Sequence, residues 1–428
     1  MSISVNPVLV TPIDNRYGKK IAIIGAFFFI FGFITWINGT LIPYLQIACE
    51  LEEWQAYLVT FAFYISYTVM AMPSSRILQW SGMVKGMSIG LVVMAVGCMI
   101  FIPAALSRMY ALFLLGLFFV GAGLTLLQTA VNPYITLLGP PETAAKRISI
   151  MGICNKVAGI LAPLIVGSII LKNSDGLIRE LAQMSAAEKS IRLDTLSRTV
   201  ILPYIILTII LLVIAIAIRF AHLPEINTTE TEKKDSDVKV SRAAQTAVNN
   251  QLVLGFMAIF CCVGAEVLAG DTIGNYGLFH GFGLDTAKSL TSYTLAGMMV
   301  GYITGVITLD RYISQQKAFY YSSWMGLVIT LLIIFVPGKA SIGFLALLGF
   351  SNAMLWPAIW PQALKGLEGK ILNKASAILI MGIAGGALLP LLYGWLTKLI
   401  NNQNAYVVLI PIYLFLLYYS AKGKKTER

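Results

Sequence analysis

Long apolar segments recur along the whole chain of 428 residues and are separated by short polar stretches. A helix needs about 20 mainly apolar residues to cross a lipid bilayer. Segments of that length predict an all-α integral membrane protein with twelve transmembrane helices. The predicted spans are 20–46, 54–78, 83–104, 109–138, 146–172, 199–220, 251–279, 286–309, 317–337, 340–365, 372–398 and 404–421.

The predicted spans divide into two similar halves. A charged stretch at 221–250 predicts a cytoplasmic linker between an N-terminal six-helix bundle, 1–220, and a C-terminal six-helix bundle, 251–428. Two such bundles with pseudo-two-fold symmetry form a transporter architecture that binds its substrate between the halves, near the membrane midplane. The fifth and eleventh spans support the repeat, because each has a proline with a glycine four residues before it and four after it: Gly159, Pro163 and Gly167, and Gly386, Pro390 and Gly394.

Composition and charge agree with a membrane protein. The chain is 57% hydrophobic and 12% charged, whereas an average soluble domain has about 25% charged residues, so an ordinary cytosolic enzyme is excluded. The net charge of +11 would suggest a nucleic-acid partner for a soluble protein. Most of the 31 Lys and Arg residues, however, fall in loops on the same side as both termini. The positive-inside rule then places both termini in the cytoplasm, and we expect a monomer that binds no nucleic acid.

Cysteine and histidine provide little for catalysis. The five cysteines form no CxxC pair, and the two histidines, His222 and His280, flank apolar segments. A disulfide framework or a zinc site is therefore not expected. We expect neither an enzyme nor a bound metal, and no cofactor other than a coupling ion.

Three ionisable residues lie within predicted spans: Lys156 in the fifth span, and Glu266 and Asp271 in the seventh. Charges inside a bilayer are costly and commonly face a cavity or a partner. At a rise of 1.5 Å per residue, Lys156 and Glu266 both fall near the midplane. We expect all three in cation coupling, with Lys156 and Glu266 as a switch. The alternative is a permanent ion pair that only holds the halves together.

Amide and aromatic side chains within the spans are candidates for substrate binding. An amide suits a neutral polyol because it offers both donors and an acceptor, although it can instead join helices. Aromatic faces, such as those of Trp36, Tyr64 and Tyr67, suit the C–H face of a sugar ring, although they also pack or anchor at the interface. The predicted substrate-binding residues are Asn38, Gln128, Asn132, Asn155, Asn275, Asn352, Trp356 and Gln362.

Several sequence strings carry a resemblance to a known family. They are TWINGTLIP at 35–43, LQTAVNPYITLLGP at 127–140, VGAEVLAGD at 263–271, NAMLWPAIWPQALKGL at 352–367 and IMGIAGGALLPLLYG at 380–394. The chain resembles the fucose–galactose–glucose:cation symporter family of the major facilitator superfamily. It looks closest to bacterial glucose/galactose transporters of a Bacteroidetes type.

The resemblance implies a secondary transporter of the bacterial inner membrane. Such a protein imports a monosaccharide, of glucose/galactose type or fucose or another hexose, by symport with H⁺ or Na⁺ and alternating access. The departures concern the proton path. The aspartate and the glutamate of the L-fucose permeases correspond to Gly39 and Gln128 here, the family asparagine is retained as Asn155, and a common arginine is Tyr302.

Coupling must therefore rest on other acids, and Glu266 and Asp271 are those that remain in the spans. We predict that Glu266→Gln abolishes gradient-driven accumulation and spares counterflow. Two alternatives stay open. The first is an efflux exchanger for amphipathic compounds, which would have a more apolar, methionine-lined site. The second is a non-transporting membrane sensor or a membrane enzyme.

Overall fold

A computed structural model describes residues 15–137, 144–171, 174–220, 242–309, 312–365, 367 and 369–425. The described chain is helical almost throughout. The N-terminal half contains α1 (Asn15–Trp36), α2 (Asn38–Ala48), α3 (Glu53–Ala56), α4 (Leu58–Ser81), α5 (Met83–Ser107), α6 (Tyr110–Leu137), α7 (Ala144–Ile170), α8 (Ser174–Gln183), α9 (Ala186–Arg198) and α10 (Ile201–Phe220). The C-terminal half contains α12 (Arg242–Asp271), α13 (Ile273–Phe279), α14 (Leu284–Ala287), α15 (Leu290–Thr308), α16 (Gln315–Phe335), α17 (Ala340–Asn352), α18 (Leu355–Leu364), α19 (Gly369–Met381), η2 (Gly382–Ala384), α20 (Gly385–Leu399), η3 (Asn404–Val408) and α21 (Leu409–Lys425).

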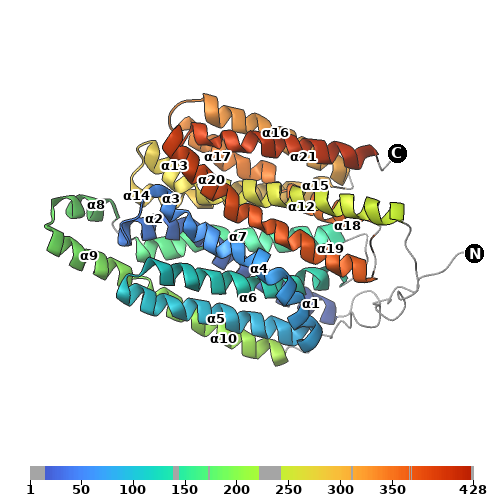
Figure 1. The fold of residues 1–428 in the computed structure, drawn as a ribbon, viewed down its shortest axis with the longest axis horizontal. Helices are drawn as coiled ribbons and strands as arrows, with labels where there is room; N and C mark the ends of the chain where they lie inside the picture. The colour runs from blue at the N-terminus through green and yellow to red at the C-terminus, as the bar shows by residue number, and fades with distance from the viewer. Residues whose placement is uncertain are drawn as a thin grey trace, which may run out of the picture.

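Among the described residues, twelve helical segments are long and apolar enough to cross a membrane. The prediction of twelve spans is therefore confirmed. The long helices run roughly side by side, and the two halves of the chain lie in two separate groups (Figure 1). The described chain begins in α1 and ends in α21 at one end of the molecule, and α8, α9 and α14 lie at the opposite end, which we call the far end (Figure 1).

Several spans are broken, the first and the tenth near their middle and the seventh near the far end. The first is divided between α1 and α2 at Ile37, the seventh between α12 and α13 at Thr272, and the tenth between α17 and α18 at residues 353–354. Irregular backbone at membrane depth is tolerated where it is buried in protein or lines a cavity. These breaks lie beside Trp36, Asp271 and Trp356.

The repeated glycines explain how the two bundles come so close. A Cβ on Gly159 of α7 would lie 2.9 Å from Leu295 of α15, and one on Gly386 of α20 would lie 3.1 Å from the Tyr64 ring of α4. In both cases the glycine of one bundle faces a side chain of the other. The pattern found in the fifth and eleventh spans therefore marks the two seams between the bundles, α7 against α15 and α20 against α4.

Two segments differ from their predicted form. Residues 174–198 lie between the fifth and sixth predicted spans, where no helix was predicted, and form the short helices α8 and α9 at the far end. Ser185 caps α9, because its hydroxyl accepts a hydrogen bond from the Glu188 amide while the Glu188 carboxylate accepts from the Ser185 amide. Of the predicted linker, 221–241 lies outside the described residues, and 242–250 begins α12.

Candidate substrate cavity between the two bundles

A cavity of about 140 Å³ lies between the two bundles, near the middle of the spans. It is mixed in chemistry, with aromatic, amide and charged side chains from both halves. Its lining residues are Phe28, Phe31, Thr35, Trp36, Tyr64, Tyr67, Gln128, Asn132, Ile148, Gly152, Asn155, Lys156, Val263, Glu266, Val267, Tyr302, Trp356 and Ile383.

The amide wall of the cavity comes from α6 and α7. Gln128 donates a hydrogen bond from Nε2 to the Tyr67 hydroxyl at 3.2 Å, which fixes the amide in orientation and leaves its carbonyl oxygen for another donor. Asn132 lies one turn further along the same face of α6. Asn155 accepts a long hydrogen bond, 3.5 Å, from the Trp36 indole, and donates one of 3.4 Å to the Phe28 carbonyl. Bonds of that length are weak, so the Asn155 amide can exchange them for a bound hydroxyl.

An ion pair crosses the cavity wall from one bundle to the other. Lys156 of α7 places Nζ 2.5 Å from Oε1 of Glu266 on α12. The Lys156 ammonium also lies 4.5 Å from the centroid of the Trp36 ring, within cation–π range. The side chains are 5% and 14% exposed. The two charges thus neutralise each other at the cavity, and the pair joins the two halves.

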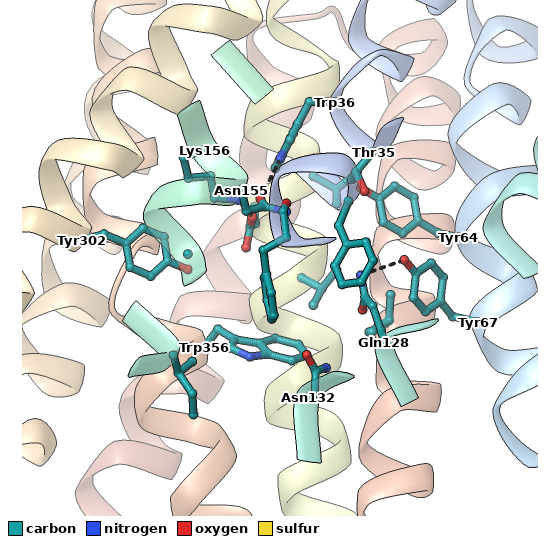
Figure 2. A pocket seen from close by; sticks show the side chains of 18 residues that line it. Thr35, Trp36, Tyr64, Tyr67, Gln128, Asn132, Asn155, Lys156, Tyr302 and Trp356 are labelled. Carbon is teal, nitrogen blue, oxygen red and sulfur yellow. Dashed lines mark hydrogen bonds and ion pairs between the residues drawn. The ribbon is translucent and has the colours of Figure 1, made fainter. Parts of the chain in front are cut away.

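Aromatic rings close the two ends of the cavity. In Figure 2, Trp36 lies at one end, and Trp356 and Asn132 lie at the other. Tyr64 and Tyr67 stack with ring centroids 6.1 Å apart on one side, and Tyr302 lies on the opposite side (Figure 2). Flat, weakly polar faces thereby flank the amides, an arrangement suited to a small molecule that has both hydroxyl groups and C–H surfaces.

The cavity brings together half of the predicted binding residues: Gln128, Asn132, Asn155 and Trp356. It does not include the remaining four, which lie elsewhere: Asn38, Asn275 and Asn352 are buried, and Gln362 is half-buried. Asn352 accepts a 2.6 Å hydrogen bond from the Tyr413 hydroxyl, and Gln362 donates one to the Tyr419 carbonyl, so both join helices within the C-terminal bundle. Asn275 donates to Gln46 toward the far end, and Asn38 lines a separate small cavity inside the N-terminal bundle.

Of the three predicted coupling residues, Lys156 and Glu266 line the cavity, and Asp271 does not. Asp271 lies at the seam between the bundles, where Thr60 of α4 donates a hydrogen bond to its Oδ2 at 3.1 Å.

Several lining residues were not predicted as binding residues, among them Thr35, Phe28 and Phe31. They belong to the part of α1 from residue 21 onward, which is apolar apart from Thr35 beside Trp36. Tyr302 was noted only as a departure from the family pattern, yet its ring lies against Gly152, where a Cβ would be 2.9 Å away.

Polar contacts between the bundles close the far end. Asp175 accepts a 2.6 Å hydrogen bond from the Leu284 amide, and Lys288 donates one of 2.8 Å to the Leu171 carbonyl. On the other seam, Lys398 pairs with Glu52 at 2.6 Å, and Asn402 bonds Glu53. These contacts form the far-end seal, which separates the cavity from that side.

The seal also affects one carboxyl outside the spans. The hydrogen bond from Lys398 holds the pKa of Glu52 below its usual value, and a second bond from the Trp54 indole adds to this effect.

Two six-helix bundles around a central polar cavity define the class of two-bundle secondary transporters. Comparison with known proteins supports the assignment to this class. The Major Facilitator Superfamily model matches residues 24–382, and the chain belongs to this superfamily. It is 32% identical to a glucose/galactose transporter of Brucella abortus over 97% of each chain. It is 27% identical to the L-fucose-proton symporter of Escherichia coli, over 91% of this chain and 89% of that protein.

The crystal structure of FucP in the outward conformation has the same fold, with a TM-score of 0.74, 25% identity, and coverage of 96% of this chain and 99% of that one. The resemblance to the fucose–galactose–glucose:cation symporter family is thereby confirmed, and so is the transporter fold.

Proposed function

We propose that this protein imports a monosaccharide of glucose/galactose type by symport with H⁺ or Na⁺. The observation that carries the proposal is the cavity between the bundles, with Gln128, Asn132 and Asn155 on its wall and Trp36 and Trp356 at its ends. The names of the relatives, glucose/galactose transporter and L-fucose-proton symporter, support a sugar.

The lining favours a neutral sugar over an amphipathic compound. Amides donate to and accept from hydroxyls, and the Lys156–Glu266 pair adds no net charge that would require a charged substrate. Among the described residues, no methionine lines the cavity, whereas an efflux site for amphipathic compounds was expected to be rich in methionine. The efflux alternative therefore gains no support.

Alternating access follows from the position of the contacts. The basic loops near the termini favour a cytoplasmic position for both termini, and with that orientation the far end faces outward. With the far-end seal closed, the outward path to the cavity is blocked. Rocking of one bundle against the other would break this seal and expose the cavity to the outside. The intramembrane groups Lys156, Glu266 and Asp271 are the candidates for coupling this motion to a cation.

Uptake into proteoliposomes tests the proposal. Labelled glucose, galactose, fucose and mannose are each offered under an imposed proton gradient, and separately under a sodium gradient. We expect accumulation of at least one sugar under one gradient. If no sugar is taken up by accumulation or by exchange, the proposal is wrong.

A cavity variant then locates the binding site. Gln128→Ala removes an amide that the structure holds in place, and loss of one hydrogen bond to a sugar hydroxyl is expected to raise KM about tenfold. The matched control is Gln183→Ala, because Gln183 is the last, exposed residue of α8, and its KM should equal that of the wild type. Equal KM values for both variants would place the sugar elsewhere.

A further inference from the structure

Asp271 is a fully buried acid at the boundary between the bundles. It is 1% exposed, and its Oδ2 accepts the Thr60 hydrogen bond from the other bundle. Its Oδ1 has no hydrogen-bond partner among the described residues. A buried carboxylate with a vacant oxygen is strongly unfavourable unless a cation or a proton neutralises it.

Among the described residues, the helices around Asp271 supply no cation that pairs with it. Of the elements that pack against α12, the segments α2, α13, α15, α17, α18 and η2 contain no Asp, Glu, Lys or Arg. The cation of α20 is Lys398, which pairs with Glu52 at the far end. Two further lysines lie nearby and have partners of their own, since Lys156 pairs with Glu266 and Lys288, between α14 and α15, pairs with Asp285. The lysines of α19 and α21 and the arginine of α4 belong to the half of the molecule near the termini. The phenols that interact electrostatically with Asp271 are those of Tyr57 and Tyr64.

The position of Asp271 relates it to the cavity. It follows cavity-lining Val267 by four residues and therefore lies one turn further along the same face of α12. Trp36, which closes that end of the cavity, packs so closely against Gly270 that a Cβ there would overlap the ring. Asp271 thus lies just beyond this closing ring, between the cavity and the far-end seal.

We propose that Asp271 binds the coupling proton of the symporter, and that its protonation is the condition for closing the far-end seal. The inference rests on the proposed sugar symport and deepens it. It names a proton as the ion and assigns it to one of the three candidate groups.

The proton binds and leaves Asp271 as the bundles rock. When the bundles part at the far end, the Thr60 contact opens and water reaches the carboxylate, which takes one proton from outside. Closing the seal then buries a neutral acid. Without that proton, closure would bury an unpaired charge, and the bundles would stay parted. When the cavity opens toward the termini, the same proton leaves to water on that side.

Glu266 is in a different position. Its carboxylate contacts the Lys156 ammonium directly, so the charge is already neutralised while the cavity is closed at the far end. Protonation of Glu266 would leave Lys156 as an unpaired buried cation. The pair is therefore assigned to the cavity and to the link between bundles, and the proton to Asp271.

The test uses purified protein in liposomes that contain a pH-sensitive dye. For the wild type, we expect an inward proton gradient to drive accumulation of the transported sugar, and added sugar to drive proton uptake. Asp271→Asn resembles the protonated form permanently. We expect its accumulation ratio to fall to 1 and its sugar-driven proton uptake to be lost, while counterflow of sugar remains. Asp271→Glu should keep coupling.

Asp194→Asn is the matched control, because it makes the same chemical change at an exposed carboxylate paired with Arg108. It should accumulate sugar as the wild type does, and loss in both variants would overturn the assignment to Asp271. Accumulation by Asp271→Asn, or wild-type accumulation driven only by sodium without proton movement, would also overturn it. A wild type that transports no sugar in any mode would instead refute the proposed function.

If Asp271→Asn also loses counterflow of sugar, the pH dependence of accumulation by Thr60→Val is the deciding test of the proton site. In the closed form the Thr60 hydroxyl donates a hydrogen bond to the carboxylate, so without Thr60 closure over an unprotonated Asp271 becomes more costly. Removal of the hydroxyl should move the pH of half-maximal accumulation upward by about half to one unit. An unchanged pH profile would overturn the inference.

Discussion

The Lys156–Glu266 pair allows a quantitative prediction about the contact between the bundles. At 2.5 Å and an effective dielectric constant of about 20, two unit charges attract by about 6–7 kcal/mol. Desolvation of both ions offsets most of this energy, so the pair contributes little relative to an apolar pair. Removal of one partner is different, because it leaves the other charge buried and alone, at a typical cost of about 3–5 kcal/mol.

Glu266 reaches the cavity and is 14% exposed, so water relieves part of this cost. We therefore expect Lys156→Met and Glu266→Gln each to lower the free energy of unfolding by about 2–3 kcal/mol. The double variant should lose much less than the sum, which gives a coupling energy of about 2 kcal/mol.

Unfolding in mixed micelles titrated with a denaturing detergent measures these free energies. The four proteins of the cycle are compared under one set of conditions. Single-variant losses that add to within about 0.5 kcal/mol would refute the reasoning, because independent losses mean that the two charges do not interact.

Two further predictions concern packing and the far-end seal. Gly385→Ala should lower the free energy of unfolding by about 1–3 kcal/mol, because the new Cβ would overlap the Phe260 carbonyl. Gly343→Ala is the control and should leave the free energy of unfolding unchanged, because nothing lies within 4 Å of a Cβ at that position. Equal losses of thermal stability in the two variants would contradict this prediction. Lys398→Met should raise the pKa of Glu52 and speed labelling of a cysteine introduced beneath the seal by at most about fivefold, since the pair is exposed. Because the pKa of Glu52 is lowered, the pair stabilises the closed seal at neutral pH, and this stabilisation is lost as pH falls through that pKa. A labelling rate that changes neither with Lys398→Met nor with lower pH would exclude a role for the pair.

Much of the architecture follows from the sequence alone. Twelve apolar segments are long enough to span a bilayer, and a segment of that kind has little choice but to form a helix, because lipid cannot satisfy the backbone polar groups. The cost of burying charged groups in lipid also explains why Lys156 and Glu266 stand out within their apolar spans. Charges placed near the midplane must find a partner, and they find each other.

The sequence could not decide which amides face the cavity, because helix rotation is set by packing between helices. Trp36 and Asn38 are two residues apart and so lie on nearly opposite sides of the first span, where Trp36 faces the cavity and Asn38 lies inside the N-terminal bundle. Breaks in the spans add to this difficulty. Asn352 and Trp356 are four residues apart and would share one face of an unbroken helix, yet Asn352 ends α17 and bonds Tyr413, whereas Trp356 belongs to α18 and lines the cavity.

For Asp271, too, the sequence identifies the residue and the tertiary structure shows its surroundings. Composition and position identify an acid within a span, and the cost of burying a charge makes it a candidate for function. Only the tertiary structure shows that it has Thr60 of the opposite bundle as its hydrogen-bond partner and lies beyond the ring that closes the cavity. The sequence determines which groups are costly to bury, because that depends on the residue and its depth. The packing of the two bundles decides what neutralises each of them.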